Sequence, residues 1–282
     1  MNLWNKTVDL VRTGTSVKHY YRNMNMALRR LNEEFTMLHF PMEGADTSSF
    51  IQSQKNLTDF CVSLIDDLQD KHALEIGCGN GIQAMYINTQ YRPASFTGID
   101  LDPGNIEIAK SEMKIREIEN MRFFVDDAQR LEEIETDSMD VVINIESAFH
   151  YPDKAAFLSQ IARVLKPGGT FVIADLLTTA RNKGVGIRRL WKRNMMIHHW
   201  EKKRYVAELD NSNLAMDQSI DITKGVIQGF RNYRDWIRDM KKFGFLKDMI
   251  FKIFYIINVQ WTLYCLRYRR EYFVFVGNKP IR

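Results

Sequence analysis

Residues 74–81 are Leu-Glu-Ile-Gly-Cys-Gly-Asn-Gly, in which three glycines stand at alternate positions after a short apolar segment. We predict a strand at 72–76 that runs into this loop, and a helix at 81–90 after it. Glycines let the backbone turn sharply and bring a ligand against main-chain amides, and the following helix presents its N-terminus to that ligand. The loop therefore predicts a cofactor site at the carboxyl end of the first strand of an open α/β sheet.

Strand-like and helix-like segments alternate on both sides of this loop. Residues 139–145 (MDVVINI) are nearly all apolar, as in a strand buried on both faces. The alternation favours a doubly wound α/β sheet. Further strands are predicted at 94–99, 121–125, 170–174 and 272–276, and helices at 103–117, 152–165 and 233–243. Residues 245–270 suit a strand and a helix equally well.

The acid that ends the second predicted strand sharpens this interpretation. Asp100 lies about twenty residues beyond the glycine loop, where a carboxylate can accept hydrogen bonds from both hydroxyls of a ribose. Its alternative role is the N-cap of the helix beginning at Pro103, for which Asp102 competes. The glycines follow Gly-x-Gly-x-Gly and not the dinucleotide pattern Gly-x-Gly-x-x-Gly, which disfavours a nicotinamide dehydrogenase.

Together these segments resemble the class I S-adenosylmethionine (SAM) dependent methyltransferases. LEIGCGNG is similar to the first motif of that superfamily, GIDLDP to the second, VDDAQRL to the third, and residues 140–177 to the stretch from strand four through strand five. The resemblance covers residues 71–177 without a gap. It implies a seven-stranded, mostly parallel Rossmann-like sheet with SAM as the cofactor. The implied cofactor contacts are Gly77, Cys78, Gly79, Gly81, Gln83, Asp100, Leu101, Asp127, Ala128 and Ile145.

The N-terminal segment adds a narrower resemblance. Residues 18–21 (KHYY) and 38–40 (LHF) are similar to the cap of the small-molecule branch, which includes sugar O-methyltransferases and tocopherol, sterol and isoprenoid C-methyltransferases. In that branch the cap folds over the cofactor, so Tyr20 or Tyr21 would contact it; core packing is the alternative. Pro41-Met42 departs from the glycine-tyrosine pair that usually follows His-Phe.

Two candidate catalytic residues follow the fourth predicted strand. His150 is suited to deprotonate a hydroxyl, because imidazole titrates near neutral pH; packing ahead of Pro152 is its alternative. The resemblance to sterol and isoprenoid C-methyltransferases implies that Glu146 orients the acceptor or stabilises a positive intermediate. A hydrogen bond to the N-terminal cap is the alternative for Glu146.

Four regions are expected along the chain: a helical cap at 1–68, a SAM-binding core at 69–177, an acceptor lid at 178–229, and a C-terminal helix with closing strands at 230–282. Between residues 181 and 204 the lid contains nine basic residues and one acid, with Trp191, Trp200 and the pair His198-His199. The tryptophans suggest an apolar acceptor pocket, and the cations suit a phosphate, a carboxylate or an anionic membrane surface. A solvated helix face with inward tryptophans is the alternative.

No metal site is expected. Adjacent histidines on a helix point apart, and Cys61, Cys78 and Cys265 match no zinc spacing. Sparse cysteines also suggest no disulfide framework and a cytoplasmic protein. Residues 249–266 approach the length of a transmembrane helix, but Lys252, Asn258 and Gln260 favour buried core or a lipid-facing patch. Peripheral membrane contact through the basic lid or this apolar segment is therefore an option.

A small-molecule acceptor is expected in preference to nucleic acid. Residues 144–147 (NIES) lack the Asn/Asp-Pro-Pro-Tyr type motif with which base-modifying enzymes stack an extruded base. The apolar C-terminal third favours a lipophilic acceptor. A polar or phosphorylated acceptor bound by the basic lid and a non-catalytic SAM-binding protein stay open as alternatives, as do O-, N- and C-methylation and the oligomeric state.

Overall fold

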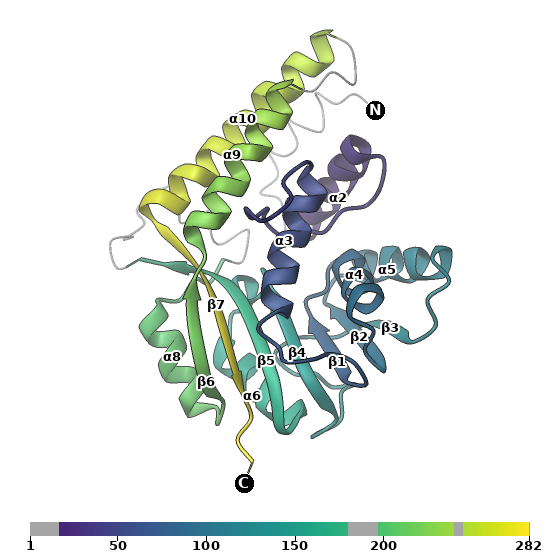
Figure 1. Ribbon diagram of the computed structural model, residues 1–282, viewed down its shortest axis with the longest axis vertical. Helices are drawn as coiled ribbons and strands as arrows, with labels where there is room; N and C mark the ends of the chain where they lie inside the picture. The colour runs from purple at the N-terminus through teal and green to yellow at the C-terminus, as the bar shows by residue number, and fades with distance from the viewer. Residues whose placement is uncertain (1–16, 180–196, 240–244, 282) are drawn as a thin grey trace.

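The computed structural model describes residues 17–179, 197–239 and 245–281, and it is built on one seven-stranded sheet (Figure 1). The strand order is β3-β2-β1-β4-β5-β7-β6. β7 runs antiparallel to β5 and β6, and the other neighbours are parallel. The predicted doubly wound, mostly parallel sheet is confirmed. Its strands are β1 His72–Ile76, β2 Ser95–Asp100, β3 Met121–Val125, β4 Met139–Ile145, β5 Leu165–Thr178, β6 Ala215–Asp221 and β7 Arg270–Asn278.

Helices cover both faces of the sheet because alternate strand residues face opposite sides. One face carries Val141, Ile143 and Ile145 of β4 and packs against α3, α4 and α5. The opposite face carries Val142 and packs against α6 and α8. The helices are α2 Val17–Asn32, α3 Phe50–Val62, α4 Ile82–Tyr91, α5 Pro103–Ile115, α6 Lys154–Val164, α8 Lys202–Asn211, α9 Thr223–Asp239 and α10 Phe245–Tyr268, with a 3-10 turn, η1, at Ala148–His150.

The connection between β6 and β7 is a helical hairpin made of α9 and α10, which pack along each other and rise beyond one edge of the sheet (Figure 1). α10 resolves the ambiguity at 245–270 in favour of a helix of 24 residues. In the described ranges, no helix is both long and apolar enough to cross a membrane. The described side chains of the apolar segment at 249–266 instead pack within the hairpin, line a cavity or face solvent.

The range expected for the acceptor lid, 178–229, is divided among several places. Residues 215–221 form β6, an edge strand of the sheet, and α8 packs on the face opposite the cap. Trp200 is buried there beside Tyr205. Of the nine basic residues between 181 and 204, Lys202, Lys203 and Arg204 begin α8. The other six, from Arg181 to Arg193, lie outside the described residues, as does Trp191.

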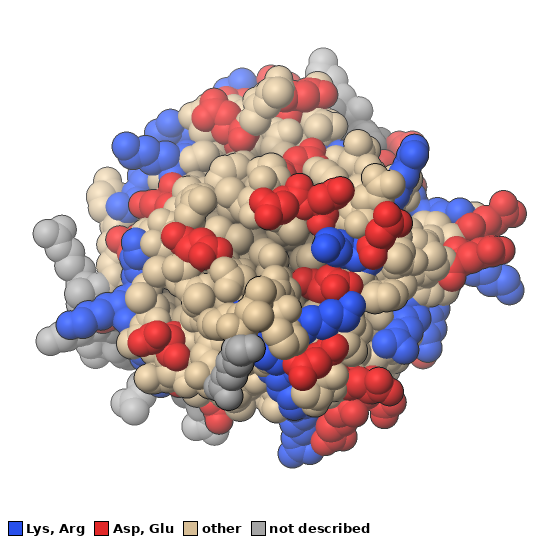
Figure 2. Space-filling view, turned by 60° about the horizontal axis from the view of Figure 1, so that its bottom comes forward, with Lys and Arg blue, Asp and Glu red and all other residues tan. Residues whose placement is uncertain are grey.

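Basic and acidic side chains are interspersed on the face of the molecule seen in Figure 2. Lysines and arginines there alternate with aspartates and glutamates over a background of uncharged residues. Among the described residues, that face therefore shows no continuous basic surface of the kind with which a protein follows a nucleic-acid backbone.

Candidate active site

Two cavities adjoin at the carboxyl edge of the sheet. The glycine-loop cleft, of about 340 Å³, is lined by residues that follow β1, β2, β3 and β4. The hairpin cavity, of about 600 Å³, lies among the cap, η1, α9 and α10. Tyr21, Leu38, His39, Glu146 and His150 line both cavities. These five residues therefore mark the junction where molecules held in the two cavities would meet.

The glycine loop forms one wall of the cleft. Gly77 and Gly79 both have left-handed backbone angles, with φ of +72° and +54°, which favour glycine. A Cβ on Gly77 would lie 2.4 Å from Oγ of Ser147, so a side chain is also excluded by space. Cys78 and Gln83 line the cleft beside them. The turn thus exposes backbone to a ligand, as the sequence predicted for a glycine loop.

Two residues expected at the cofactor, Gly81 and Tyr20, do not line the cleft. Gly81 is not among the residues that line the cleft; a Cβ there would lie 2.6 Å from Cβ of Ala109, so this glycine permits α4 to pack closely on α5. Tyr20 lines the hairpin cavity and not the cleft. Tyr21, one residue on, lines both.

Asp100 is oriented at the end of β2 by three donors. Its carboxylate accepts from the backbone N–H of Gly79 at 3.0 Å and of Asp102 at 2.8 Å, and from Nδ2 of Asn105 at 3.2 Å. The N-cap of α5 is Asp102, whose side chain accepts from the N–H of Gly104. Asp100 is therefore not the cap of α5, and its carboxylate borders the cleft.

Besides Oε1 of Glu146 at the junction, two buried polar atoms of cleft-lining residues lack hydrogen-bond partners within the described part of the chain: Oε2 of Glu75 and Nε2 of Gln83. Burial, with a smaller contribution from Asp100, raises the pKa of Glu75 to about 8. An unpaired acceptor and an unpaired donor are costly unless a ligand satisfies them. The ammonium and carboxylate of an amino-acid group have the matching polarity.

The other end of the cleft is lined by Leu101, Asp127, Ala128 and Ile145, all of which the sequence placed at the cofactor. Leu101 is 53% exposed although apolar, so a flat ligand could cover it. Oδ1 of Asp127 accepts from the N–H of Gln129 at 2.9 Å. The preceding acid, Asp126, only organises the loop, since it accepts three backbone N–H groups.

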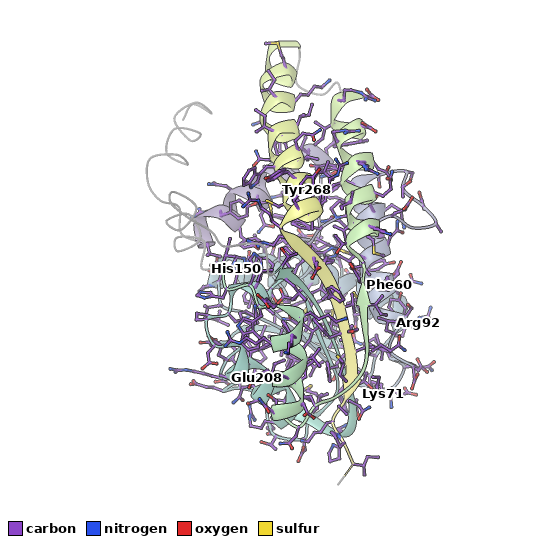
Figure 3. All side chains as sticks on the ribbon, turned by 90° about the vertical axis from the view of Figure 1, so that its left-hand side faces the viewer. Phe60, Lys71, Arg92, His150, Glu208 and Tyr268 are labelled. Atoms are coloured by element: carbon purple, nitrogen blue, oxygen red, sulfur yellow. The ribbon has the colours of Figure 1, made fainter. Side chains whose placement is uncertain are left out.

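His150 and Tyr21 meet at the junction of the cavities. Nε2 of His150 and the hydroxyl of Tyr21 lie 2.8 Å apart, and the rings pack edge to face. Burial raises the pKa of Tyr21 well above its usual value, so the phenol stays protonated at neutral pH. Figure 3 shows His150 at the edge of the sheet that faces the α9–α10 hairpin. The pair is therefore placed to move a proton between the two cavities.

Glu146 sits at the same junction in a left-handed conformation, with φ of +54°. Its Oε2 accepts from the N–H of Phe40 at 2.9 Å, which is the bond to the cap named as its alternative role. Burial raises the pKa of Glu146 well above its usual value, which favours the protonated form of the carboxyl. Oε1 has no hydrogen-bond partner among the described residues.

A polar network that the sequence interpretation missed supports the glycine loop. Nδ2 of Asn144 donates to the carbonyl of Ile76 at 2.8 Å and to Oγ of Ser147 at 2.6 Å, and the hydroxyl of Tyr151 donates to the same Oγ at 2.8 Å. Ser147 and Tyr151 also line the cleft. The sequence signal that could have identified Ser147 and Tyr151 is their position directly after the fourth predicted strand.

The hairpin cavity is mainly apolar. Of the described residues in the range expected for the lid, Ile197 and His199 line the cavity and His198 does not. Its polar members away from the junction include Asn258, Arg269 and Arg270. The apolar lining comes chiefly from α2, α9 and α10, with Met24, Leu28, Phe230, Tyr233, Tyr255 and Trp261.

Comparisons with known proteins agree with this architecture. Residues 74–173 match the family model described as a methyltransferase domain. Over 144 residues the chain is 35% identical to the phthiotriol/phenolphthiotriol dimycocerosates methyltransferase of Mycobacterium leprae, covering 51% of each chain. Over 109 residues it is 39% identical to the fatty-acid O-methyltransferase of Mycolicibacterium smegmatis, covering 39% of this chain and 38% of that one. The chain thus matches at most about half the length of these relatives.

Solved structures show the fold over a larger share. A putative sarcosine dimethylglycine methyltransferase from Galdieria sulphuraria superposes with a TM-score of 0.77 at 14% identity, over 92% of this chain and 98% of that one. The geranyl diphosphate C-methyltransferase of Streptomyces coelicolor has a TM-score of 0.69 at 14% identity, with the same coverage.

Proposed function

We propose that this chain, in which residues 74–173 form a SAM-dependent methyltransferase domain, binds SAM in the glycine-loop cleft and methylates a lipophilic small molecule held in the hairpin cavity. The observation that carries the proposal is the junction of the two cavities at Tyr21, Glu146 and His150. A methyl donor in one cavity and an acceptor in the other would meet there, and alignment of two reactants supplies a large part of the rate of such a transfer.

The chain's own groups fit the cofactor. Asp100 would accept hydrogen bonds from the ribose hydroxyls, and Leu101, Asp127 and Ala128 would contact the adenine. Glu75 and Gln83 would pair with the ammonium and carboxylate of the methionine portion, which gives their unpaired buried atoms partners. When bound, SAM supplies a methyl group already activated on a sulfonium.

A lipophilic acceptor is supported by the lining of the hairpin cavity and by the relatives. Aromatic and aliphatic side chains dominate the cavity, so it favours a ligand with a long apolar part. Two relatives are named for dimycocerosate lipids and for fatty acids. Because those matches cover half of each chain or less, the cavity is the primary support.

We assign the transfer to an oxygen of the acceptor. The acceptor's hydroxyl proton would pass to the oxygen of Tyr21 as Tyr21 passes its own proton to Nε2 of His150, at 2.8 Å. The positive charge then resides on the imidazolium. Glu146 holds the cap by accepting a hydrogen bond from the N–H of Phe40, and it would orient the acceptor oxygen through its second carboxyl oxygen.

The proposal is tested with methyl-labelled SAM and three defined acceptors: a long-chain fatty acid, a long-chain alcohol and a lipophilic phenol. Label is counted in organic solvent and in water. We expect label in the organic phase, lost in Asp100→Ala through cofactor binding and in His150→Ala with cofactor binding retained. If a cell extract replaces the defined acceptors and label is transferred only to its water-soluble compounds, the assignment of a lipophilic acceptor is overturned. SAM binding without any transfer would indicate a non-catalytic SAM-binding protein, and no SAM binding would refute the central assignment.

A further inference from the structure

α10 presents a stripe of exposed apolar side chains along its length. The members recur at intervals of three and four residues, so they share one face of the helix. Ile253 and Ile257 are 54% and 63% exposed, which is far from the burial expected of isoleucine. The α10 stripe consists of Met249, Ile253, Ile257, Trp261, Tyr264 and Tyr268.

The α10 stripe is continuous with the hairpin cavity. Trp261 belongs to both, since it is 48% exposed and also lines the cavity. Tyr255, Thr262 and Leu266 line the cavity from the neighbouring face of the same helix. A lipophilic molecule that leaves the stripe would therefore enter the cavity past one side chain.

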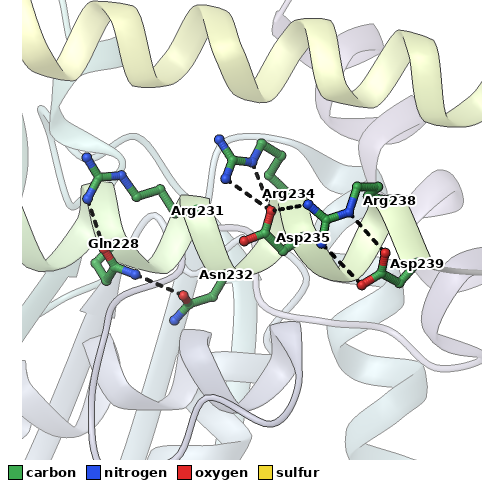
Figure 4. Close-up of polar contacts among 7 residues, drawn as sticks. All are labelled: Gln228, Arg231, Asn232, Arg234, Asp235, Arg238 and Asp239. Carbon is green, nitrogen blue, oxygen red and sulfur yellow. Dashed lines mark hydrogen bonds and ion pairs between the residues drawn. The ribbon is translucent and has the colours of Figure 1, made fainter.

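The charge along α10 is net positive, since its three cations, Lys247, Lys252 and Arg267, outnumber its one acid, Asp248. Residues 249–270 contain no aspartate or glutamate and four cations: Lys252, Arg267, Arg269 and Arg270. Cations on the partner helix α9 pair with acids of the same helix. Arg234 and Arg238 both contact Asp235, at 3.0 and 3.3 Å, and Arg238 also contacts Asp239 (Figure 4). Both helices are thus net positive by about two charges, with four cations and two acids on α9 and three cations and one acid on α10. The feature that distinguishes α10 is the apolar stripe.

We propose that the α10 stripe docks on an anionic lipid surface, with the helix lying in the plane of the interface. Tryptophan and tyrosine favour the boundary between water and lipid, and isoleucine and methionine would insert below it. The exposed Arg267 on the same helix would meet anionic headgroups. Of the other cations, Lys252 donates to the carbonyl of Arg238, and Arg269 and Arg270 line the hairpin cavity. The helix is about 36 Å long and the stripe runs along most of it, so it offers an extended contact. Vesicle binding is independent of turnover, so this inference does not rest on the proposed function.

The test is flotation with vesicles of phosphatidylcholine and of phosphatidylcholine mixed with phosphatidylglycerol. We expect binding to the anionic vesicles, weaker binding at high salt, and at least a tenfold loss in Ile253→Asp/Ile257→Asp. Neither residue lines a cavity, so methylation of a detergent-dispersed acceptor should persist. The matched control is Ile115→Asp/Ile281→Asp, which adds the same charge at apolar residues 70% and 81% exposed, and it should bind like the wild type.

Folding is checked by circular dichroism. If the double variant fails to fold, the single variant Ile257→Asp makes the same comparison at the more exposed site. Wild-type protein that binds neither vesicle, or variants that bind as well as the wild type, would overturn the proposal. So would a wild-type dimer that Ile257→Asp dissociates while vesicle binding is absent, since a second copy of the chain would then cover the stripe.

Discussion

The hydroxyl of Tyr21 lies 2.8 Å from Nε2 of His150, across a sequence separation of 129 residues. Tyr21 belongs to the cap helix α2, and His150 ends the turn η1 that follows β4. Both side chains line both cavities. The contact therefore joins the cap helix to the candidate base.

The first prediction concerns this pair. Tyr21→Phe should lower kcat by about 10- to 100-fold, because the proton path to His150 loses its hydroxyl, while the Kd for SAM changes less than about threefold. Single-turnover kinetics and calorimetry measure the two quantities. Tyr86→Phe removes a hydroxyl that bonds only Asp59 among the described residues, and it should leave kcat unchanged. Full activity in Tyr21→Phe would remove the relay from the mechanism.

The second prediction distinguishes Asp100, which is assigned to the ribose hydroxyls, from Asp102, which caps α5. Asp100→Ala should weaken SAM binding by about 10- to 100-fold, since two charge-assisted hydrogen bonds to the ribose are lost. Asp102→Ala should leave the Kd near wild type but lower stability by about 1 kcal/mol, because it removes the N-cap of α5. Titration calorimetry and thermal unfolding of both variants make the comparison. Equal Kd values in the two variants would contradict the assignment of Asp100.

The third prediction is a proton released on cofactor binding. With a pKa of about 8, Glu75 is mostly protonated at pH 7, and a bound ammonium would favour its carboxylate. Binding of the ammonium must then lower the raised pKa of Glu75, so Glu75 releases up to about one proton at pH 7. Above pH 8 the carboxyl of Glu75 is already ionised before the cofactor binds, so the release declines. Calorimetry in buffers of different ionisation enthalpy measures the proton. Glu75→Gln should eliminate the release; an unchanged release in that variant would place the proton on another group.

Strands β1, β3 and β4 were predicted with their observed bounds, because each is a short apolar run closed by turn residues or charges. α10 was not resolved from sequence. Its aromatic and β-branched residues suit both kinds of element, and the choice depends on packing against α9, which no local pattern encodes.

The candidate site shows the same division between local and distant information. Asp100 was identified because its spacing from the glycine loop is a local property. Gly81 was predicted at the cofactor with the other two glycines because three alternate glycines look alike in sequence, and the approach of Ala109 shows that Gly81 serves helix packing. The bond from Phe40 to Glu146 joins residues 106 positions apart, so sequence could name it only as an alternative.

The last prediction concerns a buried ion pair behind the hairpin cavity. Nζ of Lys154 lies 3.4 Å from Oδ2 of Asp175 and 2.5 Å from the carbonyl of His198, so it also anchors the segment that brings His199 to the cavity. Both charged side chains are fully buried.

Lys154→Met should lower the free energy of unfolding by about 3–5 kcal/mol, because Asp175 then loses its cation in a buried site. The double variant Lys154→Met/Asp175→Asn should recover part of that loss. The matched cycle at the partly exposed pair Lys166–Asp140 should give a coupling below about 1 kcal/mol. Chemical denaturation measures both cycles, and equal couplings would show that burial of Lys154 adds nothing to the pair.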